Sequence, residues 1–515
     1  MGDFYVQLRL RHIARNVFSN WFVTAANMAV GFFLAPFIVH RLGNAAYGVW
    51  VLAISSVNYL NLLDLGMRSS VLRFISKGHT VGDHASASDA LSAALWVRLQ
   101  VSGVVMLLSV GLASAFPHLF KIPSDMAHSA QIAVMIIGCT TSLGMSLGVF
   151  GGVISGLNRY DLQSVVTMVQ LVIRVIGVVI VLRSGHGIIA IALCEFAAAL
   201  VGNLMLMWLA RRIYPELRLR LGKPKPGILR SLWTYSFYAF LTTIAVQLVY
   251  QTDNLVVGTF ISATAVTFYS IGNALCRYTD QFAGVMTMTF VPAASTYEAA
   301  GHTEGLRSLY YTGTRATLGL SLPILTTLIL RGHNFIGLWM GRDYAHEAGN
   351  ILVILAIPIM FAYANRTAVS IAFGVEKHKK SAIWAIGEGV ANLALSITLV
   401  HWFGIYGVAI GTMIPSLFVQ LFLWPPFVHE LVGVKTVDVY LRVWAPMFLA
   451  VVPFAIISYA VNAYFPARSV VMFMLQTIAI LPVFVGVVGL IYRRSLGTYV
   501  LPRIRSFMLA RTRAT

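Results

Sequence analysis

The sequence predicts an all-α polytopic membrane protein with about 14 transmembrane helices. Of its 515 residues, 58% are hydrophobic and 11% are charged, whereas soluble proteins carry about 25% charged residues. Apolar stretches of about 20 residues, long enough to cross a bilayer, recur along the whole chain. Lys and Arg residues are concentrated in every second loop, as they are in the cytoplasmic loops of membrane proteins. We expect two six-helix lobes in parallel pseudo-repeat, followed by two extra C-terminal helices.

The predicted spans follow one another with short loops, none of which could hold a soluble catalytic domain. The first span follows Arg9, Arg11 and Arg15 and has no small-residue cleavage site, so we expect a retained helix and not a signal peptide. The predicted spans cover residues 17–39, 46–65, 89–114, 129–155, 161–182, 187–210, 232–254, 265–292, 311–330, 350–373, 382–402, 404–427, 441–463 and 469–492.

The positive charges predict that both termini are cytoplasmic. With that orientation, 26 of the 37 Lys and Arg residues lie in cytoplasmic loops and six in outside loops, Arg331 among the latter. An odd number of spans would break this alternation. The formal net charge of +19 is therefore a signal of topology, and we expect no nucleic-acid partner. All three cysteines lie within apolar spans, so no disulfide framework is expected.

The chain divides at a basic stretch that is rich in Pro and Gly, which break helices. We expect an N-terminal lobe at 1–220, a cytoplasmic linker at 221–230, a C-terminal lobe at 231–428, and two further spans with a basic tail at 429–515. The loop at 42–50 and the loop at 261–269 share their pattern of small, apolar and aromatic residues. Six spans per lobe preserve orientation, so the repeats would be parallel. This architecture is typical of transporters with a substrate site between the lobes.

Five arginines lie inside predicted spans and not at their ends. Each would cost about 2.5–3.5 kcal/mol at the centre of a lipid-facing helix. The guanidinium group binds phosphate or carboxylate bidentately, so five charges of one sign favour a hydrophilic cavity for an anionic substrate. The alternative is that they form hydrogen bonds between helices. The five are Arg98, Arg174, Arg277, Arg315 and Arg366.

Other polar residues share helix faces with two of these arginines. Gln170 lies four residues before Arg174, and Asn273 lies four residues before Arg277, which places each pair on one face of a helix. We therefore add Gln170 and Asn273 to the predicted substrate-binding set. Asp280, three residues after Arg277, competes as a partner that would neutralise it.

Five acidic residues also lie in or at the end of predicted spans. An intramembrane carboxylate is by default a candidate proton or cation site. Asp253, Glu388 and Asn392 would form an ion-coupling site if spans 7 and 11 meet. The alternative, which we favour, is that the acids pair with the buried arginines. The acids are Asp64, Glu195, Asp253, Asp280 and Glu388.

No pattern for a cofactor, a metal or a catalytic centre is found in the sequence. Gly144-Met-Ser146-Leu-Gly148 matches the nucleophile elbow, but that motif requires a strand-to-helix turn, which a membrane helix does not provide. The glycines at 144, 148, 152 and 156 form a four-residue ladder. Such a ladder predicts close approach of a neighbouring helix.

Three segments resemble the start of the bacterial polysaccharide-export flippases. These are the residues from Leu42 to Leu52, those from Leu60 to Gly66, and Arg73-Phe74. The flippases belong to the multidrug/oligosaccharidyl-lipid/polysaccharide exporter superfamily, and the expected layout of about 14 spans extends the resemblance over nearly the whole chain.

This resemblance implies translocation of an undecaprenyl-diphosphate-linked oligosaccharide across the bacterial inner membrane by alternating access. The product would serve O-antigen, capsule or exopolysaccharide biosynthesis. Expected partners are the lipid-linked substrate, membrane lipids, a polysaccharide polymerase, glycosyltransferases, and a proton or sodium counter-ion. The central cavity would be cationic, with Tyr250, Gln251 and Tyr363 contacting the glycan. Spans 13 and 14 would be peripheral.

Three other functions remain open from the sequence. A multidrug antiporter of the same superfamily would have a cavity in which carboxylates outnumber arginines. A membrane-embedded polysaccharide polymerase or ligase would typically carry a large periplasmic loop, whereas the longest outside loop here, at about 331–349, is short. A scaffold for synthesis enzymes would have no reason to bury five charges.

Overall fold

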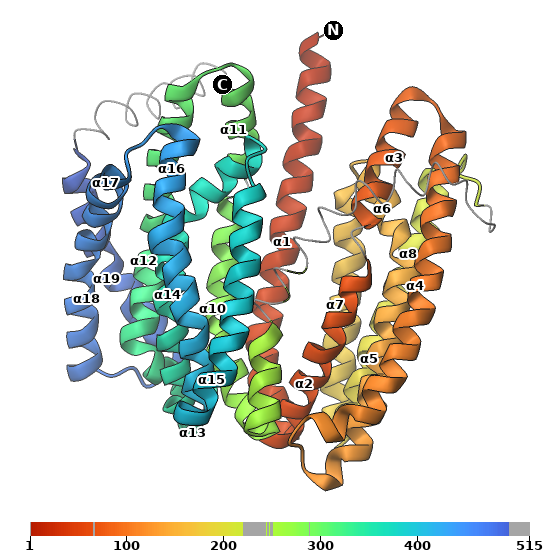
Figure 1. The fold of residues 1–515 in the computed structure, drawn as a ribbon, viewed down its shortest axis with the longest axis horizontal. Coiled ribbons are helices and arrows are strands. Elements are labelled where there is room, and N and C mark those ends of the chain that lie inside the picture. Colours follow the sequence, from red (N-terminus) through yellow and green to blue (C-terminus); the bar gives the residue numbers. More distant parts are fainter. Residues whose placement is uncertain are drawn as a thin grey trace. The chain divides into compact units, whose positions relative to one another are not determined.

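The computed structural model describes residues 2–64, 67–219, 244, 247, 251–287 and 289–493. Within these ranges the regular structure is helical and contains no strand (Figure 1). The predicted all-α polytopic class is therefore confirmed.

Eleven helical segments within the described residues are long and apolar enough to cross a membrane. One of them, Lys379–Val432, covers two predicted spans. These two spans are separated by a kink in α15 (Lys379–Phe418) at Gly404, where φ is 56°. Most of predicted span 7 lies outside the described residues. Predicted span 8 corresponds to α10 (Ala263–Thr287), which is rich in polar residues and is not among the eleven. The number fourteen thus stays a prediction.

Several helices extend well beyond the predicted spans. They are α1 (Gly2–Leu42), α4 (His84–Leu119) and α12 (Thr303–Trp339). The length of α12 corrects one prediction, since Arg331 lies inside this helix and not in an outside loop. Apolar residues resume after Asn334 and continue to Trp339, and no proline stands between Arg331 and Met340 to end the helix.

A helix also forms where a cytoplasmic loop was predicted. After α2 (Asn44–Leu60) and the short η1 (Asn61–Asp64), the chain forms α3 (Met67–Val81). Val71 and Ile75, four residues apart, are fully buried and belong to a core shared with α4. The helix forms because its apolar residues gather on one face while the other stays polar.

Predicted span 4 is divided into α5 (Ala127–Leu147) and α6 (Val149–Gly156). The division falls at Gly148, the second glycine of the ladder. A Cβ at Gly148 would lie 2.3 Å from the carbonyl oxygen of Gly144, and one at Gly156 would lie 2.9 Å from Ile75 of α3. The last glycine therefore permits the close approach that the ladder predicted, whereas Gly148 marks a break in the helix.

The remaining helical elements complete the two halves of the chain. They are η2 (Ser124–Met126), α7 (Tyr160–Arg183), α8 (Ile188–Ile213), α11 (Phe290–Ala299), α13 (Arg342–Ala345), α14 (Glu347–Gly374), η3 (Val419–Leu423), α16 (Trp424–Val432), α17 (Thr436–Asp438), η4 (Val439–Trp444), α18 (Ala445–Tyr464) and α19 (Val470–Ile491).

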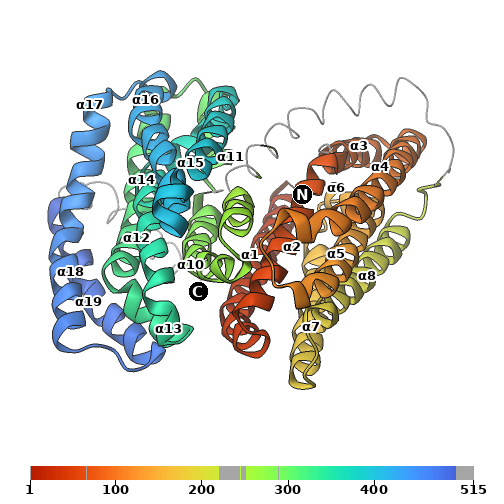
Figure 2. The same cartoon turned by 60° about the horizontal axis from the view of Figure 1, so that its bottom comes forward.

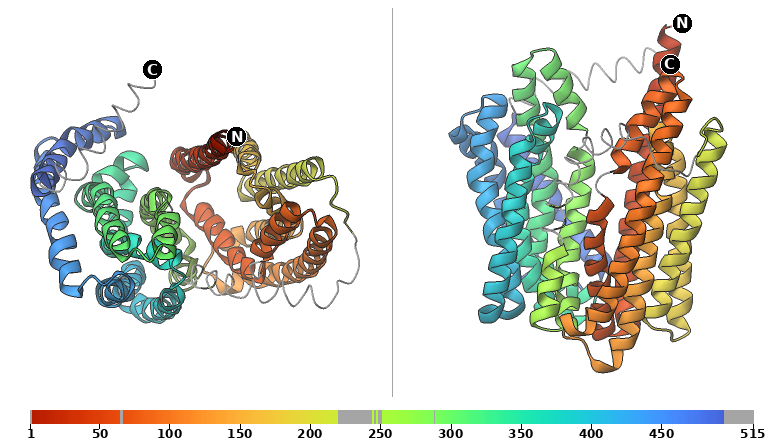
Figure 3. Two further views of the ribbon diagram at one scale, coloured as in Figure 1. Left: turned by 90° about the horizontal axis from the view of Figure 1, so that it is seen from above. Right: turned by 45° about the vertical axis from the view of Figure 1, so that its right-hand side comes forward.

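The chain forms two compact units. The first comprises 1–270 with 385–408, and the second comprises 271–384 with 409–515. In the first unit, α4, α5 and α8 lie side by side, with α7 packed against α8 (Figure 2). In the second unit, α18 and α19, in blue, lie against α12 (Figure 3). These units divide the chain differently from the predicted lobes, and the predicted linker 221–230 lies outside the described residues, so the lobe boundaries stay a prediction.

The two corners whose sequences resemble each other pack together within the first unit. The hydroxyl of Thr267 donates a 2.7 Å hydrogen bond to the carbonyl oxygen of Asn44. A Cβ at Gly48 would lie only 1.7 Å from the carbonyl oxygen of Ala263. Glycine is therefore required at position 48, because any side chain there would displace the backbone at the start of α10.

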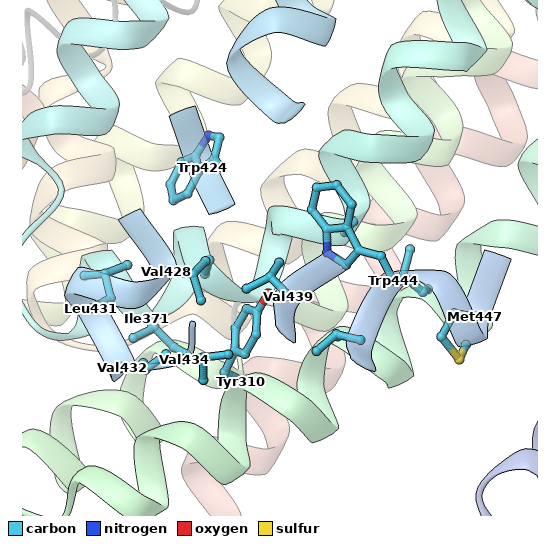
Figure 4. Packing of buried hydrophobic residues seen from close by; sticks show 14 of the residues in the cluster. Tyr310, Ile371, Trp424, Val428, Leu431, Val432, Val434, Val439, Trp444 and Met447 are labelled. Atoms are coloured by element: carbon cyan, nitrogen blue, oxygen red, sulfur yellow. The ribbon is translucent and has the colours of Figure 1, made fainter. Parts of the chain in front are cut away.

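The core of the second unit surrounds Tyr310 of α12, which is fully buried. Val439 and Trp444 of η4 and Met447 of α18 belong to the same cluster (Figure 4). Both η3 and η4 are π-helices, which are wider than α-helices and are frequent at functional sites. The hydroxyl of Tyr440 in η4 donates a hydrogen bond to the carbonyl oxygen of Leu421 in η3, so the two π-helices are directly joined.

Candidate substrate-binding site

Arg98 of α4 is deeply buried in the first unit, with only 4% of its surface exposed. Its Nη2 lies 2.6 Å from Oδ1 of Asp64 in η1. Asp64 belongs to one of the segments that carry the family resemblance. This pair confirms, for Asp64, the predicted pairing of a buried acid with a buried arginine.

Arg174 of α7 also has an acidic partner within the first unit. Its Nε lies 2.9 Å from Oε1 of Glu195 on α8, and 41% of its side chain is exposed. Gln170, one turn earlier on α7, packs against Gly202 of α8, where a Cβ would lie 1.9 Å from its Nε2. The predicted polar face of this helix is therefore the face that contacts α8.

In the second unit, Arg366 of α14 forms an ion pair with Asp280 of α10. About a quarter of each side chain is exposed, 27% and 29% respectively. Asp280 thus pairs with Arg366 of a neighbouring helix and not with Arg277 of its own helix. Arg277 is exposed on α10, and no ion pair involves it in the described part of the chain. Asn273, four residues earlier, is half-buried.

Arg315 of α12 lies against aromatic rings and not against an acid. Its guanidinium carbon is 4.3 Å from the ring centroid of Tyr492, at the end of α19. It is 5.6 Å from the ring of Tyr311 on its own helix. The second unit therefore places Arg315 where α12 and α19 meet.

Arg331 is a buried cation that the sequence reasoning missed. It is fully buried, and its guanidinium carbon lies 4.5 Å from the ring centroid of Phe473. Its Nη2 donates a hydrogen bond to Oε1 of Gln476 on α19. A signal was available, since the residues from Asn334 to Trp339 could have continued the predicted helix.

The predicted ion-coupling residues Asp253, Glu388 and Asn392 all belong to the first unit. Asp253 is 5% exposed, and its Oδ2 accepts a 2.6 Å hydrogen bond from the hydroxyl of Tyr269. Asn392 is 2% exposed, and its Oδ1 accepts a 2.8 Å hydrogen bond from the hydroxyl of Ser396. Glu388 is half-buried.

Two polar contacts beside Asp253 were not predicted. The amide of Asn254 donates a 3.1 Å hydrogen bond to the hydroxyl of Ser55 on α2, and the hydroxyls of Tyr59 and Thr252 lie 2.6 Å apart. These contacts join α2 to the helix that carries Asp253. The spacing of these residues in the sequence does not indicate the contacts, because they depend on how that helix packs against α2.

The three residues expected near the glycan have different surroundings. Tyr363 of α14 is fully buried in the second unit, and Gln251 is half-buried. Tyr250 lies outside the described residues. The three cysteines are free thiols.

A family model and curated relatives match this chain over most of its length. The model for the family described as polysaccharide biosynthesis protein matches residues 13–298. An uncharacterized membrane protein of Bacillus subtilis, EpsK, is 24% identical over 415 residues, covering 78% of this chain and 80% of EpsK. The probable low-salt glycan biosynthesis flippase Agl15 of Haloferax volcanii is 22% identical over 400 residues, covering 78% of this chain and 80% of Agl15.

A solved structure shares the fold at low sequence identity. The lipid II flippase MurJ, in an inward closed conformation, superposes with a TM-score of 0.69 at 13% identity. The match covers 93% of this chain and 99% of MurJ.

Proposed function

Because the chain belongs to the polysaccharide biosynthesis protein family, we propose that it flips an undecaprenyl-diphosphate-linked oligosaccharide across the bacterial inner membrane by alternating access. It is a multi-pass membrane protein of the flippase class, and it acts in polysaccharide biosynthesis and transport. In the proposed orientation both termini are cytoplasmic, and the oligosaccharide would supply O-antigen, capsule or exopolysaccharide assembly.

Two kinds of similarity support the proposed substrate class. Agl15 carries the name probable low-salt glycan biosynthesis flippase, and MurJ the name lipid II flippase. A lipid-linked saccharide has a polar head that cannot cross the bilayer unaided, so a protein that moves it must offer a polar path. Arginines and amides within membrane helices would provide such a path.

The observation that carries the proposal is the exposed guanidinium of Arg277. Arg98, Arg174 and Arg366 each have a carboxylate partner within their own unit. Arg277 has none within the described residues, so its charge is available to a diphosphate, which a guanidinium binds bidentately. The proposed substrate-binding residues are Arg277 and Asn273 first, followed by Arg98, Arg174, Arg315, Arg366 and Gln170.

The energy source would be a proton or sodium ion bound near Asp253, Glu388 and Asn392. Asp253 and Asn392 are buried, and both offer oxygen atoms, which suit a hard cation. Glycosyltransferases would act before the transport step, and a polysaccharide polymerase would act after it.

The proposal is tested by complementing a deletion strain with Arg277→Ala. We expect normal protein levels in the membrane, accumulation of lipid-linked oligosaccharide, and a loss of glycan export of about tenfold or more. This estimate rests on charge-assisted hydrogen bonds of about 1.5–3 kcal/mol.

The matched control is Arg183→Ala, which removes an exposed arginine at the end of α7. This control should export normally. Unimpaired export in the Arg277→Ala strain would refute the assignment of Arg277.

A further inference from the structure

Two arginines of α12 contact rings of α19, one towards each end of that helix. Arg331 lies over Phe473, near the start of α19, and Arg315 lies over Tyr492, just after its last residue. The two contacts are separated by 16 residues on α12 and 19 residues on α19, or about 24 and 28 Å at 1.5 Å per residue. The two helices are therefore antiparallel, and the two arginine contacts lie at opposite ends of their interface.

These two contacts differ in access. Arg331 is fully buried and donates to Gln476, so its contact is an internal one between helices. Arg315 is only half-buried, and it borders the exposed face of α12 formed by Thr312, Ala316 and Leu320. Because these three residues are exposed, we expect a lipid to reach the guanidinium of Arg315 from this side of α12.

Two buried polar groups at Arg315 have no hydrogen-bond partner in the described part of the chain apart from each other. The guanidinium of Arg315 lies close to the hydroxyl of Tyr492, and neither its Nε nor that hydroxyl oxygen has a further partner among the described residues. Buried polar atoms are nearly always hydrogen-bonded, and an exception points to a missing water, ion or ligand. The described residues also give Arg315 no carboxylate partner, although they give one to Arg98, Arg174 and Arg366.

The position of the site along the helices indicates the chemistry of the ligand. Tyr492 follows the last residue of α19, and the exposed Arg493 comes next. In the predicted topology this end is cytoplasmic, so it lies near the phosphate groups of the inner leaflet. A phosphate there would accept hydrogen bonds from a guanidinium, which binds it in a bidentate manner, and from a phenol hydroxyl.

We propose that Arg315 and Tyr492, with Arg493 beside them, form a binding site for the phosphate group of an inner-leaflet lipid. The rings of Tyr311 and Tyr492 hold the guanidinium in place by cation–π contacts. The phosphate belongs either to a bulk phospholipid or to a polyprenyl diphosphate. Arg315 also belongs to the proposed substrate-binding set, but the lipid site does not rest on the transport function, because a bulk phospholipid would occupy it whether or not the protein transports a saccharide.

The experiment measures lipid binding by the purified full-length protein in detergent, from its thermal unfolding midpoint. The probes are phosphatidylglycerol, undecaprenyl diphosphate, and diacylglycerol as the lipid without a phosphate. We expect at least one phosphate-bearing lipid to raise the midpoint of the wild type, and diacylglycerol to have no effect. A response to phosphatidylglycerol identifies a phospholipid site, whereas a response to undecaprenyl diphosphate alone identifies a site for the transported lipid.

Three variants test the residues. Arg315→Gln should lower the apparent affinity for the phosphate-bearing lipid about tenfold or more, and Tyr492→Phe should lower it about threefold, as expected for the loss of charged and neutral hydrogen bonds. Arg315→Lys keeps the charge but loses the planar fork, so it should bind with intermediate affinity and remain folded. Wild-type affinity in Arg315→Gln would overturn the proposal, as would an equal response to diacylglycerol.

Two controls separate this site from the proposed transport site. Arg342→Gln removes an exposed arginine of α13 and should leave lipid binding unchanged. Arg277→Ala should retain phosphatidylglycerol binding even where it loses export. If Arg277→Ala exports normally while Arg315→Gln loses lipid binding, the proposed role of Arg277 fails and the lipid site stands.

Discussion

The two compact units treat their membrane-embedded arginines differently. In the first unit, Arg98 pairs with Asp64 and Arg174 pairs with Glu195. In the second, Asp280 neutralises Arg366, while Arg277, Arg315 and Arg331 have no carboxylate partner within the described residues. The first unit is therefore neutral at these positions, and the second retains positive charge.

On the proposed function, the acids, and not the number of arginines, would decide where an anion binds. A carboxylate within hydrogen-bonding distance uses the donors that a phosphate would need. Arginines with such a partner join helices, and those without one are the better candidates for a ligand. The predictions below test this division from the largest expected effect to the smallest.

The largest effect should come from breaking the pair of Arg98 and Asp64. Arg98→Ala removes a buried cation that lies 2.6 Å from the half-buried carboxylate of Asp64, so we expect the free energy of unfolding to fall by about 3–5 kcal/mol, as when one partner of a buried pair is removed. Denaturant or thermal unfolding in detergent measures the loss.

The double variant Arg98→Met with Asp64→Leu is the control for this pair. It should recover most of the stability, because it removes both charges and keeps their volume. A single variant as stable as the wild type would show that the pair does not stabilise the first unit.

The next effect concerns Arg174, the half-exposed arginine of the first unit, compared with Arg277 of the second. Arg174→Ala removes a charge already satisfied by Glu195, so export should fall less than threefold, against tenfold or more for Arg277→Ala. Export of glycan per unit of membrane protein is the measurement. Equal losses in the two variants would remove the distinction between paired and unpaired arginines.

A smaller effect should follow from removing the carboxylate that forms an ion pair with Arg366. Asp280→Asn removes the negative charge beside Arg366 but keeps the volume of the side chain. Arg366 then adds positive charge close to Arg277, which lies on the same helix as position 280. Binding of an undecaprenyl diphosphate to the purified protein should tighten about two- to fivefold, with a steeper dependence on salt concentration. Weaker binding would instead mean that Asp280 itself contributes to substrate binding.

The smallest effect is expected at the ion pair between Arg159 and Asp161, two residues apart and partly exposed. Arg159→Gln should change the free energy of unfolding by less than about 1 kcal/mol, because exposed pairs contribute little. Thermal unfolding under the conditions used for Arg98→Ala provides the comparison. A loss as large as that of Arg98→Ala would show that burial does not set the value of these pairs.

The sequence predicts the helical class and most of the spans, because apolar length and charge alternation are local properties. It also predicts that buried acids pair with buried arginines, which the structure confirms for Asp64, Glu195 and Asp280. It does not predict which acid pairs with which arginine. Asp280 contacts Arg366, 86 residues away, because the rotation of two neighbouring helices outweighs the three-residue spacing to Arg277.

Other differences also come from contacts that no local pattern records. The polar face of α7 was expected to line a cavity. In the structure Gly202 of α8 leaves room for the side chain of Gln170, so this face of α7 contacts α8. Arg331 was assigned to a loop because it is the first charged residue after the apolar stretch of the predicted span. In the structure Phe473 and Gln476 of α19 contact its guanidinium, so the charge lies within a helix. Both outcomes depend on partners that are distant in sequence.

The two joined π-helices limit which changes of length this chain can tolerate. A π-helix usually arises where one residue has been added to an α-helix. Deleting one residue from Val419–Leu423 would restore a regular helix and leave the residues after it nearly in place, because four residues of an α-helix turn the chain about as far as five of the wider π-helix. Trp424 and Phe427 would then keep their places in the core that they share with η4, whereas the contact between Leu421 and Tyr440 would be disturbed. Alignments of relatives should therefore tolerate a gap of one residue within this segment, accompanied by a change at the position of Tyr440.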